Sequence, residues 1–552
     1  MLAAPLPSGT LLAQFPGPLS QLAEAMRAGL SFQYEQAWGF VLALHVAFFQ
    51  RLGPSAFEQV KPTLLALEQF AKDAAARYHS VASQALSTAI RTFGPAAVLS
   101  VLPLQFDLPL ASEGRREWML SVLVKGVEGA PLAFFGTYVM PLINQLRASI
   151  SLAEKQGDVF AEKHNRVLYT QVWELLPAFC TAPSDVAVQF KHLAKTIGGL
   201  LTSEPELRVT LVLALVKLIG SNRAFLPTRE EFYLPEDEED DEEDEEEGVK
   251  GSFAGRSAPI LTAKGQLTEE DARANLQEIG RFAKNFFPLL FNIFCALDNK
   301  TGSGSGQLRL RSALYNAIKA FAAVAPEDVF DAFFRDVLRK ILESGAGKGK
   351  ADLRRRALLT ELSQAFVESA APAQLEMLYK VIKPQLSDAD GKVQKKSYQV
   401  LERLCCQPSY LAGHLEELKE VLIASLSSSK ATAKKSRLRC LRYVAHALEG
   451  DPVTQLFAAD GSIPASEVLA EVIVCVKEAN KLAREEAFQL LILLNQRSAL
   501  AHPEDPSHFF QLVIAGLAGN SPTMISATVM ALTRLAHQSK GKSQNSAHHT
   551  AH

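Results

Sequence analysis

A glycine- and lysine-rich stretch, SGAGKGK at 344–350, comes nearest in this sequence to a phosphate-binding loop. Such a loop needs a glycine five residues before its Gly-Lys pair, and a Ser or Thr after the pair to bind magnesium. Leu342 and Gly349 occupy these two positions, and no strand pattern precedes them. We therefore interpret the stretch as a turn between helices and expect no cofactor.

Residues that bind metals or act as nucleophiles are present, but they lack the spacing that such sites need. The six cysteines stand at positions 180, 295, 405, 406, 440 and 475 without a CxxC pair. The histidines include His548, His549 and His552 near the end of the chain, where only adventitious metal affinity is expected. Nothing places Ser, His and Asp together. The sequence thus predicts no enzyme, no metal site and no disulfide framework, and it suits a reducing compartment inside the cell.

Basic residues form the most informative polar pattern. Residues 391–442 contain eleven Lys and Arg against four acids. Several lie where the second helix of a hairpin is expected to start, so stacked hairpins would align them in a row that could neutralise phosphates. An ordinary solvated helix face, charged for solubility, is the alternative. The candidate RNA-backbone contacts are Lys392, Lys395, Lys396, Lys430, Lys434, Lys435, Arg437 and Arg439, together with Arg354, Arg355 and Arg356.

No aromatic residues alternate with these cations at a spacing that suggests base stacking. Any RNA contact is therefore expected to involve the backbone and its shape, with little sequence preference.

The elements that must position these cations repeat along the chain. Val393, Ser397, Val400, Leu401 and Leu404 fall at offsets 0, +4, +7, +8 and +11, which gathers them on one helix face. This repeat frame returns with first residues Ala433, Ala483 and Met524, at spacings of 40, 50 and 41 residues, and also at Leu207. The period predicts an all-α solenoid of HEAT- or armadillo-type helical hairpins.

Composition divides this array into segments. We expect a disordered N-terminus over 1–20, HEAT-type repeats over 21–222, an acidic disordered insertion over 223–267, further repeats over 268–538 and a disordered tail over 539–552. No signal peptide is expected, and the longest apolar runs, such as Phe40–Phe49, are too short to cross a bilayer.

The insertion contains twelve consecutive acids, Glu236–Glu247. Without them, 48 acidic residues face 57 basic ones, so the rest of the chain carries a balance of +9. The run is interpreted as an extended, self-repelling tether. The alternative is a mimic of nucleic acid that binds basic partners or shields the protein's own basic surface.

Several segments resemble one known family. They are Tyr169–Phe190, RFAKNFFPLLF at 281–291, GKVQKKSYQVLERLC at 391–405 and EVIVCVKEANKLAREEAFQLL at 471–491, with FGPAAVL near 93–99 and WMLSVLVKGV near 118–127. Over about 35–538 the chain resembles the ribosomal RNA-processing protein twelve family of nucleolar HEAT-repeat proteins. Members of that family are longer at both ends, and the family's basic C-terminal extension has no counterpart here.

The resemblance implies a non-catalytic assembly factor of the nucleus and nucleolus. It would bind pre-ribosomal RNA and ribosomal or assembly proteins, and it would act in ribosomal RNA processing and subunit maturation and export. An importin-like transport adaptor that works with Ran or karyopherins remains an alternative, because such adaptors are also HEAT solenoids with acidic loops. A protein-interaction scaffold fits the same fold. No small-molecule substrate or membrane partner is expected.

Overall fold

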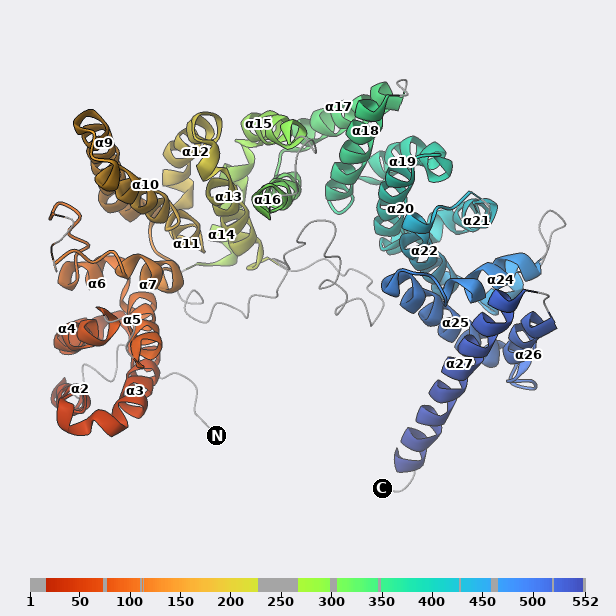
Figure 1. The fold of residues 1–552 in the computed structure, drawn as a ribbon, viewed down its shortest axis with the longest axis horizontal. Helices are drawn as coiled ribbons and strands as arrows, with labels where there is room; N and C mark the ends of the chain where they lie inside the picture. Colours follow the sequence, from red (N-terminus) through yellow and green to blue (C-terminus); the bar gives the residue numbers. More distant parts are fainter. Residues whose placement is uncertain are drawn as a thin grey trace. The chain divides into compact units, whose positions relative to one another are not determined.

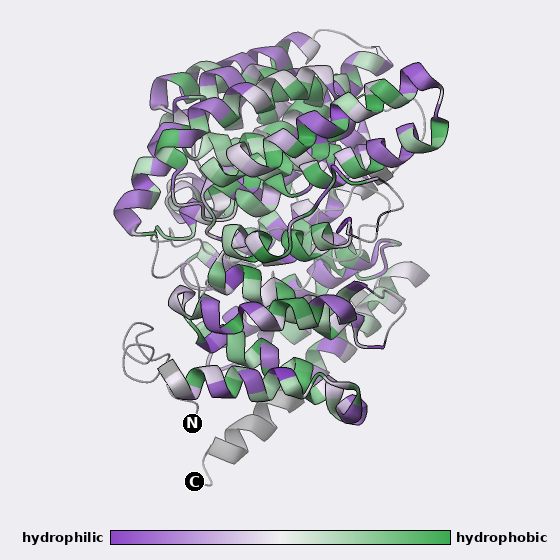
Figure 2. Cartoon of the chain, turned by 90° about the vertical axis from the view of Figure 1, so that its left-hand side faces the viewer, coloured by the Kyte–Doolittle hydropathy of each residue, from purple (hydrophilic) through white to green (hydrophobic). Residues whose placement is uncertain are grey.

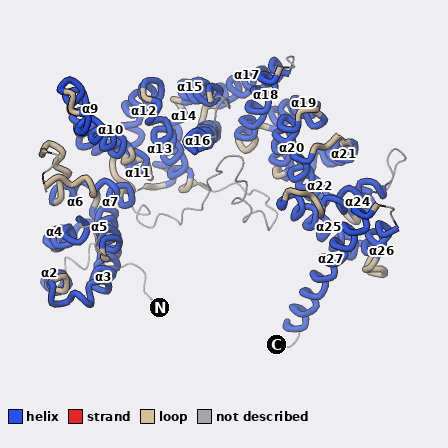
Figure 3. The backbone as a smooth tube through the Cα atoms, in the orientation of Figure 1, coloured by secondary structure: helices blue, strands red, loops and turns tan. Residues whose placement is uncertain are grey.

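The computed structural model describes residues 16–72, 77–109, 112, 114–226, 267–297, 305–345, 349–425, 428–457, 465–518 and 521–549. Helices and the turns and loops that join them make up these residues, and none of them forms a β-strand (Figure 3). The predicted all-α fold is therefore confirmed. The acidic run Glu236–Glu247 lies outside the described residues. No described helix has both the length and the hydrophobicity that a membrane span requires.

The helices belong to two compact units, which meet in sequence between Pro326 and Glu327. The first unit contains α2 (Pro16–Ala28), α3 (Trp38–Arg51), α4 (Phe57–Lys72), α5 (His79–Phe93), α6 (Pro95–Val101), α7 (Met119–Gly126), α8 (Leu132–Phe134), α9 (Met140–Gln156), α10 (Val159–Trp173), α11 (Leu176–Phe179), α12 (Val186–Ser203), α13 (Arg208–Arg223), α14 (Glu269–Gly280), α15 (Ala283–Ala296) and α16 (Ser305–Ala322) (Figure 1).

The second unit contains α17 (Glu327–Gly345), α18 (Lys350–Ser363), α19 (Pro372–Ile382), α20 (Gly391–Cys405), α21 (Pro408–Ala424), α22 (Lys434–Ala447), α23 (Pro452–Phe457), α24 (Ala465–Cys475), α25 (Lys481–Ala501), α26 (His508–Ile514) and α27 (Pro522–His549) (Figure 1). The second helices of successive hairpins, α18, α20, α22 and α25, pack on one another in that order. This row of helices carries most of the predicted basic residues.

Three predicted boundaries differ from the structure. Helix α2 starts at Pro16, inside the segment expected to be disordered, and a proline suits the first turn of a helix because its missing N–H has no partner there. Helix α27 continues to His549 through the predicted tail. The boundary between the units falls after α16, so α14 to α16 belong with the N-terminal helices and not with the clean C-terminal repeats.

Burial follows the repeat frame. All five frame residues are buried in the copies that begin at Leu207, Val393, Ala433 and Ala483, and three of five are buried in the copy that begins at Met524. Individual helices carry hydrophobic residues on the packed face and hydrophilic residues elsewhere (Figure 2). A further copy appears in α18, where Arg355 holds the first position and Leu359, Leu362, Ser363 and Phe366 are buried. One hairpin could not bury such a face alone, so stacking forms the core.

The glycine- and lysine-rich stretch at 344–350 connects two helices. Helix α17 ends at Gly345 and Gly349 precedes the first turn of α18, while residues 346–348 lie outside the described part of the chain. A helix therefore occupies the place where a phosphate-binding loop would follow a strand. All six cysteines are free thiols, and five of them are buried.

Candidate nucleic-acid interface

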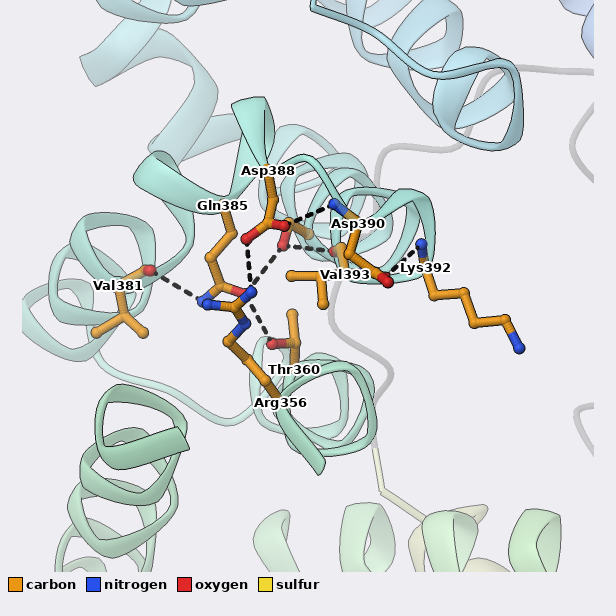
Figure 4. Close-up of polar contacts among 9 residues, drawn as sticks. Arg356, Thr360, Val381, Gln385, Asp388, Asp390, Lys392 and Val393 are labelled. Carbon is orange, nitrogen blue, oxygen red and sulfur yellow. Dashed lines mark hydrogen bonds and ion pairs between the residues drawn. The ribbon is translucent and has the colours of Figure 1, made fainter. Parts of the chain in front are cut away.

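The turn that joins α19 to α20 shows how one repeat is fixed to the next. Asp390 caps α20, because its Oδ1 accepts hydrogen bonds from the backbone N–H groups of Lys392 (2.9 Å) and Val393 (3.0 Å). Asp388 accepts from the N–H of Asp390 at 2.8 Å and receives the Arg356 guanidinium of α18 at 2.6 Å (Figure 4). The Lys392 side chain points away from this cluster (Figure 4). Arg356 therefore holds two repeats together, while Lys392 remains exposed.

The Arg356 contact belongs to a ladder between successive repeats. Arg356 stands one residue after the start of the α18 frame, and Asp388 stands five residues before the start of the α20 frame. The equivalent residue of α20 is the buried Gln394, whose side chain donates to the Ser428 carbonyl at 2.9 Å. The equivalent residue of α22 is Lys434, which pairs with Glu478 before α25. Three different side chains thus make the same connection.

Lys434 is held as a charged group by this contact. Burial is the largest single influence and would lower its pKa, but the hydrogen bond to the Glu478 carboxylate and the nearby negative charges together outweigh it and raise the pKa above the ordinary lysine value. The pair leaves the Lys434 side chain only 21% exposed. Its charge is neutralised inside the protein, which weakens its attraction for an external phosphate.

Ion pairs also join a residue six positions into one frame to a residue three positions into the next frame. The cation belongs to the later frame in one of these pairs and to the earlier frame in the other. Lys396, three residues into the α20 frame, lies 3.6 Å from Glu361, six residues into the α18 frame. Arg439, six residues into the α22 frame, donates to Glu486, three residues into the α25 frame, at 2.5 Å. Arg439 also reaches Glu402 of α20 at 3.3 Å.

Burial raises the pKa of the Glu486 carboxyl even though Arg439 and Arg442 face it. The Arg439 pairs therefore lie in a poorly hydrated part of the stack, where an unpaired charge would be costly.

Arg437 occupies the second position of the α22 frame, which faces the core. Its side chain is 1% exposed. The guanidinium donates to Glu471 Oε2 at 2.5 Å, to the Leu422 carbonyl at 2.8 Å and to Ser425 Oγ at 3.2 Å. The expectation that this residue is exposed is wrong, because three partners inside the stack use its donors. It cannot reach a phosphate in this conformation.

The predicted basic residues therefore separate into three groups. Five have structural partners in neighbouring elements: Arg356, Lys396, Lys434, Arg437 and Arg439. Four are exposed: Arg354, Arg355, Lys392 and Lys430. Lys395 and Lys435 are half-exposed. The row that the sequence predicts is therefore only partly accessible to a ligand.

The four exposed residues define what we call the basic edge: Arg354, Arg355, Lys392 and Lys430. Arg354 and Arg355 lie in the second turn of α18, Lys392 lies in the first turn of α20, and Lys430 lies in the turn before α22. Equivalent frame positions of α18, α20 and α22 make equivalent contacts with the next repeat, so the N-terminal ends of these helices lie on one side of the second unit. Lys350 and Lys481, also exposed, begin α18 and α25 on the same side. Lys350 and Lys481 could have been predicted from the sequence as further cations on this side, because each lies shortly before the start of a repeat frame.

The stacked helical hairpins, repeated about every 40 to 50 residues, define a HEAT-type repeat protein. A family model described as "Ribosomal RNA-processing protein 12, HEAT repeats" matches residues 4–296, which is more than half of the chain. The chain belongs to this family, and the resemblance expected from the sequence is confirmed.

Similar proteins come from animals and yeast. The RRP12-like protein of Gallus gallus is 32% identical over 539 residues, which cover 96% of this chain and 37% of the relative. The RRP12-like protein of Homo sapiens is 29% identical over 548 residues, with 97% and 37% covered. Ribosomal RNA-processing protein 12 of Saccharomyces cerevisiae is 22% identical over 559 residues, with 95% and 41% covered. The chain thus spans about two fifths of the length of these relatives.

Among solved structures, the crystal structure of Kap121p is similar to the chain with a TM-score of 0.46 and 12% sequence identity. The similarity covers 95% of this chain and 50% of Kap121p.

Proposed function

We propose that this chain acts as a non-catalytic assembly factor that binds pre-ribosomal particles in the nucleolus and nucleus. In this role it supports ribosomal RNA processing and the maturation and export of the ribosomal subunit. Its membership of the ribosomal RNA-processing protein 12 family and its similarity to the RRP12-like protein of Homo sapiens and to ribosomal RNA-processing protein 12 of Saccharomyces cerevisiae support this function. Its partners are then pre-ribosomal RNA and ribosomal or assembly proteins.

The basic edge is the observation from which we infer contact with RNA. Arg354, Arg355, Lys392 and Lys430 are exposed cations on one side of a rigid helix stack. Guanidinium and ammonium groups bind phosphate oxygens, and such contacts position a protein on nucleic acid without reading its bases. A row of cations on a helix stack can contact several phosphates of a folded RNA at once. It is less suited to recognising one particular base.

Sedimentation of tagged chain in nuclear extract tests this function. The full chain should travel with pre-ribosomal particles, and its bound RNA should be enriched in precursors of ribosomal RNA. A variant with Gln at all four basic-edge positions should move toward the top of the gradient. A matched variant with Gln at four exposed cations of the first unit, Lys191, Lys195, Arg273 and Lys284, should sediment like the unmodified chain.

The importin-like alternative predicts a different distribution. A chain that travels with Ran, karyopherins and soluble cargo, and is absent from pre-ribosomal fractions, would contradict the proposed function. Loss of particle binding in both variants would show that general positive charge, and not the basic edge, is responsible.

A further inference from the structure

Three side chains with metal-binding chemistry meet between two loops of the second unit. Asp451 precedes α23, His502 follows α25 and His508 begins α26. One potential ligand atom from each residue lies within 4.8 Å of the other two. We propose that Asp451, His502 and His508 bind one zinc ion, which fastens the turn before α23 to the loop between α25 and α26.

The distances within the cluster suit zinc. In a tetrahedral site with Zn–N and Zn–O bonds of about 2.0–2.2 Å, two ligand atoms lie about 3.3 Å apart. Asp451 Oδ2 and His502 Nε2 are 3.2 Å apart, so an ion can replace the proton between them with little movement. The rings of His502 and His508 have centroids 4.9 Å apart at an angle of 45°. A shift of about 1.5 Å or less brings the third ligand to the same spacing.

Hydrogen bonds already orient the first ligand. Asp451 Oδ1 accepts from the Val453 N–H at 3.0 Å, and Oδ2 accepts from the Thr454 N–H at 3.3 Å and from the Thr454 hydroxyl. The turn before Asp451 is also fixed, because Arg497 of α25 donates to the carbonyl groups of His446 and Leu448. Coordinating carboxylates in proteins are commonly held by such additional hydrogen bonds.

The histidines are oriented by their own loop. His502 Nδ1 lies 3.4 Å from Glu504 Oε1, so the second ring nitrogen faces a carboxylate while Nε2 faces Asp451. A carboxylate on the far nitrogen of a histidine ligand fixes the ring and increases its basicity. Within the loop, Asp505 Oδ1 accepts from Ser507 Oγ at 2.6 Å, and this contact shapes the chain just before His508.

The donor set determines the class of ion. Two imidazoles and one carboxylate suit zinc and neighbouring transition metals better than magnesium or calcium, which prefer oxygen ligands. Three protein ligands leave a fourth position for water. His502 retains 33% side-chain exposure, so an ion can enter from solvent. The two loops come from segments about fifty residues apart, so the ion would join distant parts of the repeat stack and stabilise the folded state.

Zinc titration by calorimetry, together with thermal unfolding, tests this site. All chains compared should carry Gln at His548, His549 and His552, because these terminal histidines can bind zinc independently. The full chain with this tail should bind one equivalent of Zn²⁺ and melt at a higher temperature with zinc than without it. The His508→Gln variant should bind at least about a hundredfold more weakly and lose the zinc-dependent rise in melting temperature. The Glu504→Gln variant should bind about tenfold more weakly.

His508→Gln is a clean substitution, because the His508 ring makes no hydrogen bond to the residues that the structure describes. His537→Gln, at an exposed position of α27, is its matched control and should bind zinc like the unmodified chain. Circular dichroism without zinc verifies that each variant is folded. The proposal is overturned if the chain with the substituted tail binds no zinc, or if His508→Gln and His537→Gln bind it equally well.

Discussion

The Arg437 guanidinium and the Glu471 carboxylate form a 2.5 Å ion pair between α22 and α24, at a frame position that other repeats fill with small or apolar side chains. Leu211, Ser397, Ala487 and Thr528 occupy the equivalent position. A charged residue there is tolerated only because Glu471, Ser425 and the Leu422 carbonyl together satisfy its donors.

Removing this guanidinium should destabilise the second unit strongly. Arg437→Met leaves Glu471 without its partner, and breaking a buried pair costs about 3 kcal/mol of unfolding free energy. Because two facing apolar groups carry no unpaired charge, Arg437→Met with Glu471→Leu should recover part of that loss. Urea unfolding measures both variants. The exposed Arg354→Gln should change stability by less than about 0.5 kcal/mol. Equal stability of Arg437→Met and the unmodified chain would contradict the buried pair.

Charges placed on the frame should disrupt the repeat stack. Leu401→Asp and Leu491→Asp each bury an unpaired carboxylate, which should lower the unfolding free energy by about 3 kcal/mol or more. Both variants should lose helical circular dichroism at a lower temperature than the unmodified chain. Leu500→Asp is a control on the same helix as Leu491, because Leu500 is 79% exposed. If Leu500→Asp were as damaging as Leu491→Asp, the frame would not define the core.

The ladder between α18 and α20 can be measured as a coupling energy. Arg356→Gln removes a charged hydrogen bond to Asp388 and should lower the unfolding free energy by about 1–2 kcal/mol. A double-mutant cycle with Asp388→Asn should give a coupling of about 1 kcal/mol, because the two side chains are in direct contact. Arg355→Gln, one residue earlier and exposed, should show no coupling to Asp388→Asn. If the stability losses of Arg356→Gln and Asp388→Asn simply add, the contact between Arg356 and Asp388 does not stabilise the ladder.

The first unit should lose stability in acid partly through His45. This side chain is 1% exposed, its Nδ1–H donates to the Val41 carbonyl at 2.7 Å, and burial lowers its pKa below the ordinary value of 6.5. The unfolded imidazole therefore takes up a proton more readily than the folded one. The contribution of His45 is complete above about pH 6.5 and is lost as the pH falls toward the lowered folded pKa.

Unfolding free energies at pH 7.5 and pH 5.0 test this prediction. The unmodified chain should lose more unfolding free energy over this interval than His45→Gln, because Gln keeps a donor but does not titrate. The difference between the two losses should be at most about 1.4 kcal/mol per pH unit. His537→Gln, which changes an exposed histidine, should behave like the unmodified chain. An identical loss in the unmodified chain and in His45→Gln would show that His45 does not contribute.

Much of the fold could be predicted from the sequence because the hydrophobic period is strong. The offsets at Val393 and Ala483 identified helix faces that the structure buries completely. The segment ends were predicted less well. Pro16 and the residues of α27 beyond Leu535 lie in stretches with a weak apolar pattern, so the hydrophobic period does not show where α2 begins or where α27 ends.

The candidate interface could be predicted only in part. The frame itself places Arg437 on the buried face, but its charge suggested exposure. Its contacts with Glu471, 34 residues away, and with Ser425 and the Leu422 carbonyl explain how it is buried. Arg354 and Arg356 are neighbours in sequence, yet one is exposed and the other pairs with Asp388. The cluster of Asp451 with His502 joins residues 51 positions apart. These relationships depend on how the repeats pack, which residue spacing alone does not specify.

Binding of structured ribosomal RNA as a function of salt concentration tests the central claim most directly. Each phosphate contact adds about 0.7–0.9 to the slope of log affinity against log salt. Replacing Arg354, Arg355, Lys392 and Lys430 with Gln should therefore reduce the slope by up to about 3.6 and weaken binding roughly tenfold or more, equally for unrelated RNA sequences. Gln at Lys191, Lys195, Arg273 and Lys284 should leave slope and affinity unchanged. A folded basic-edge variant with the affinity and slope of the unmodified chain would contradict the RNA contact.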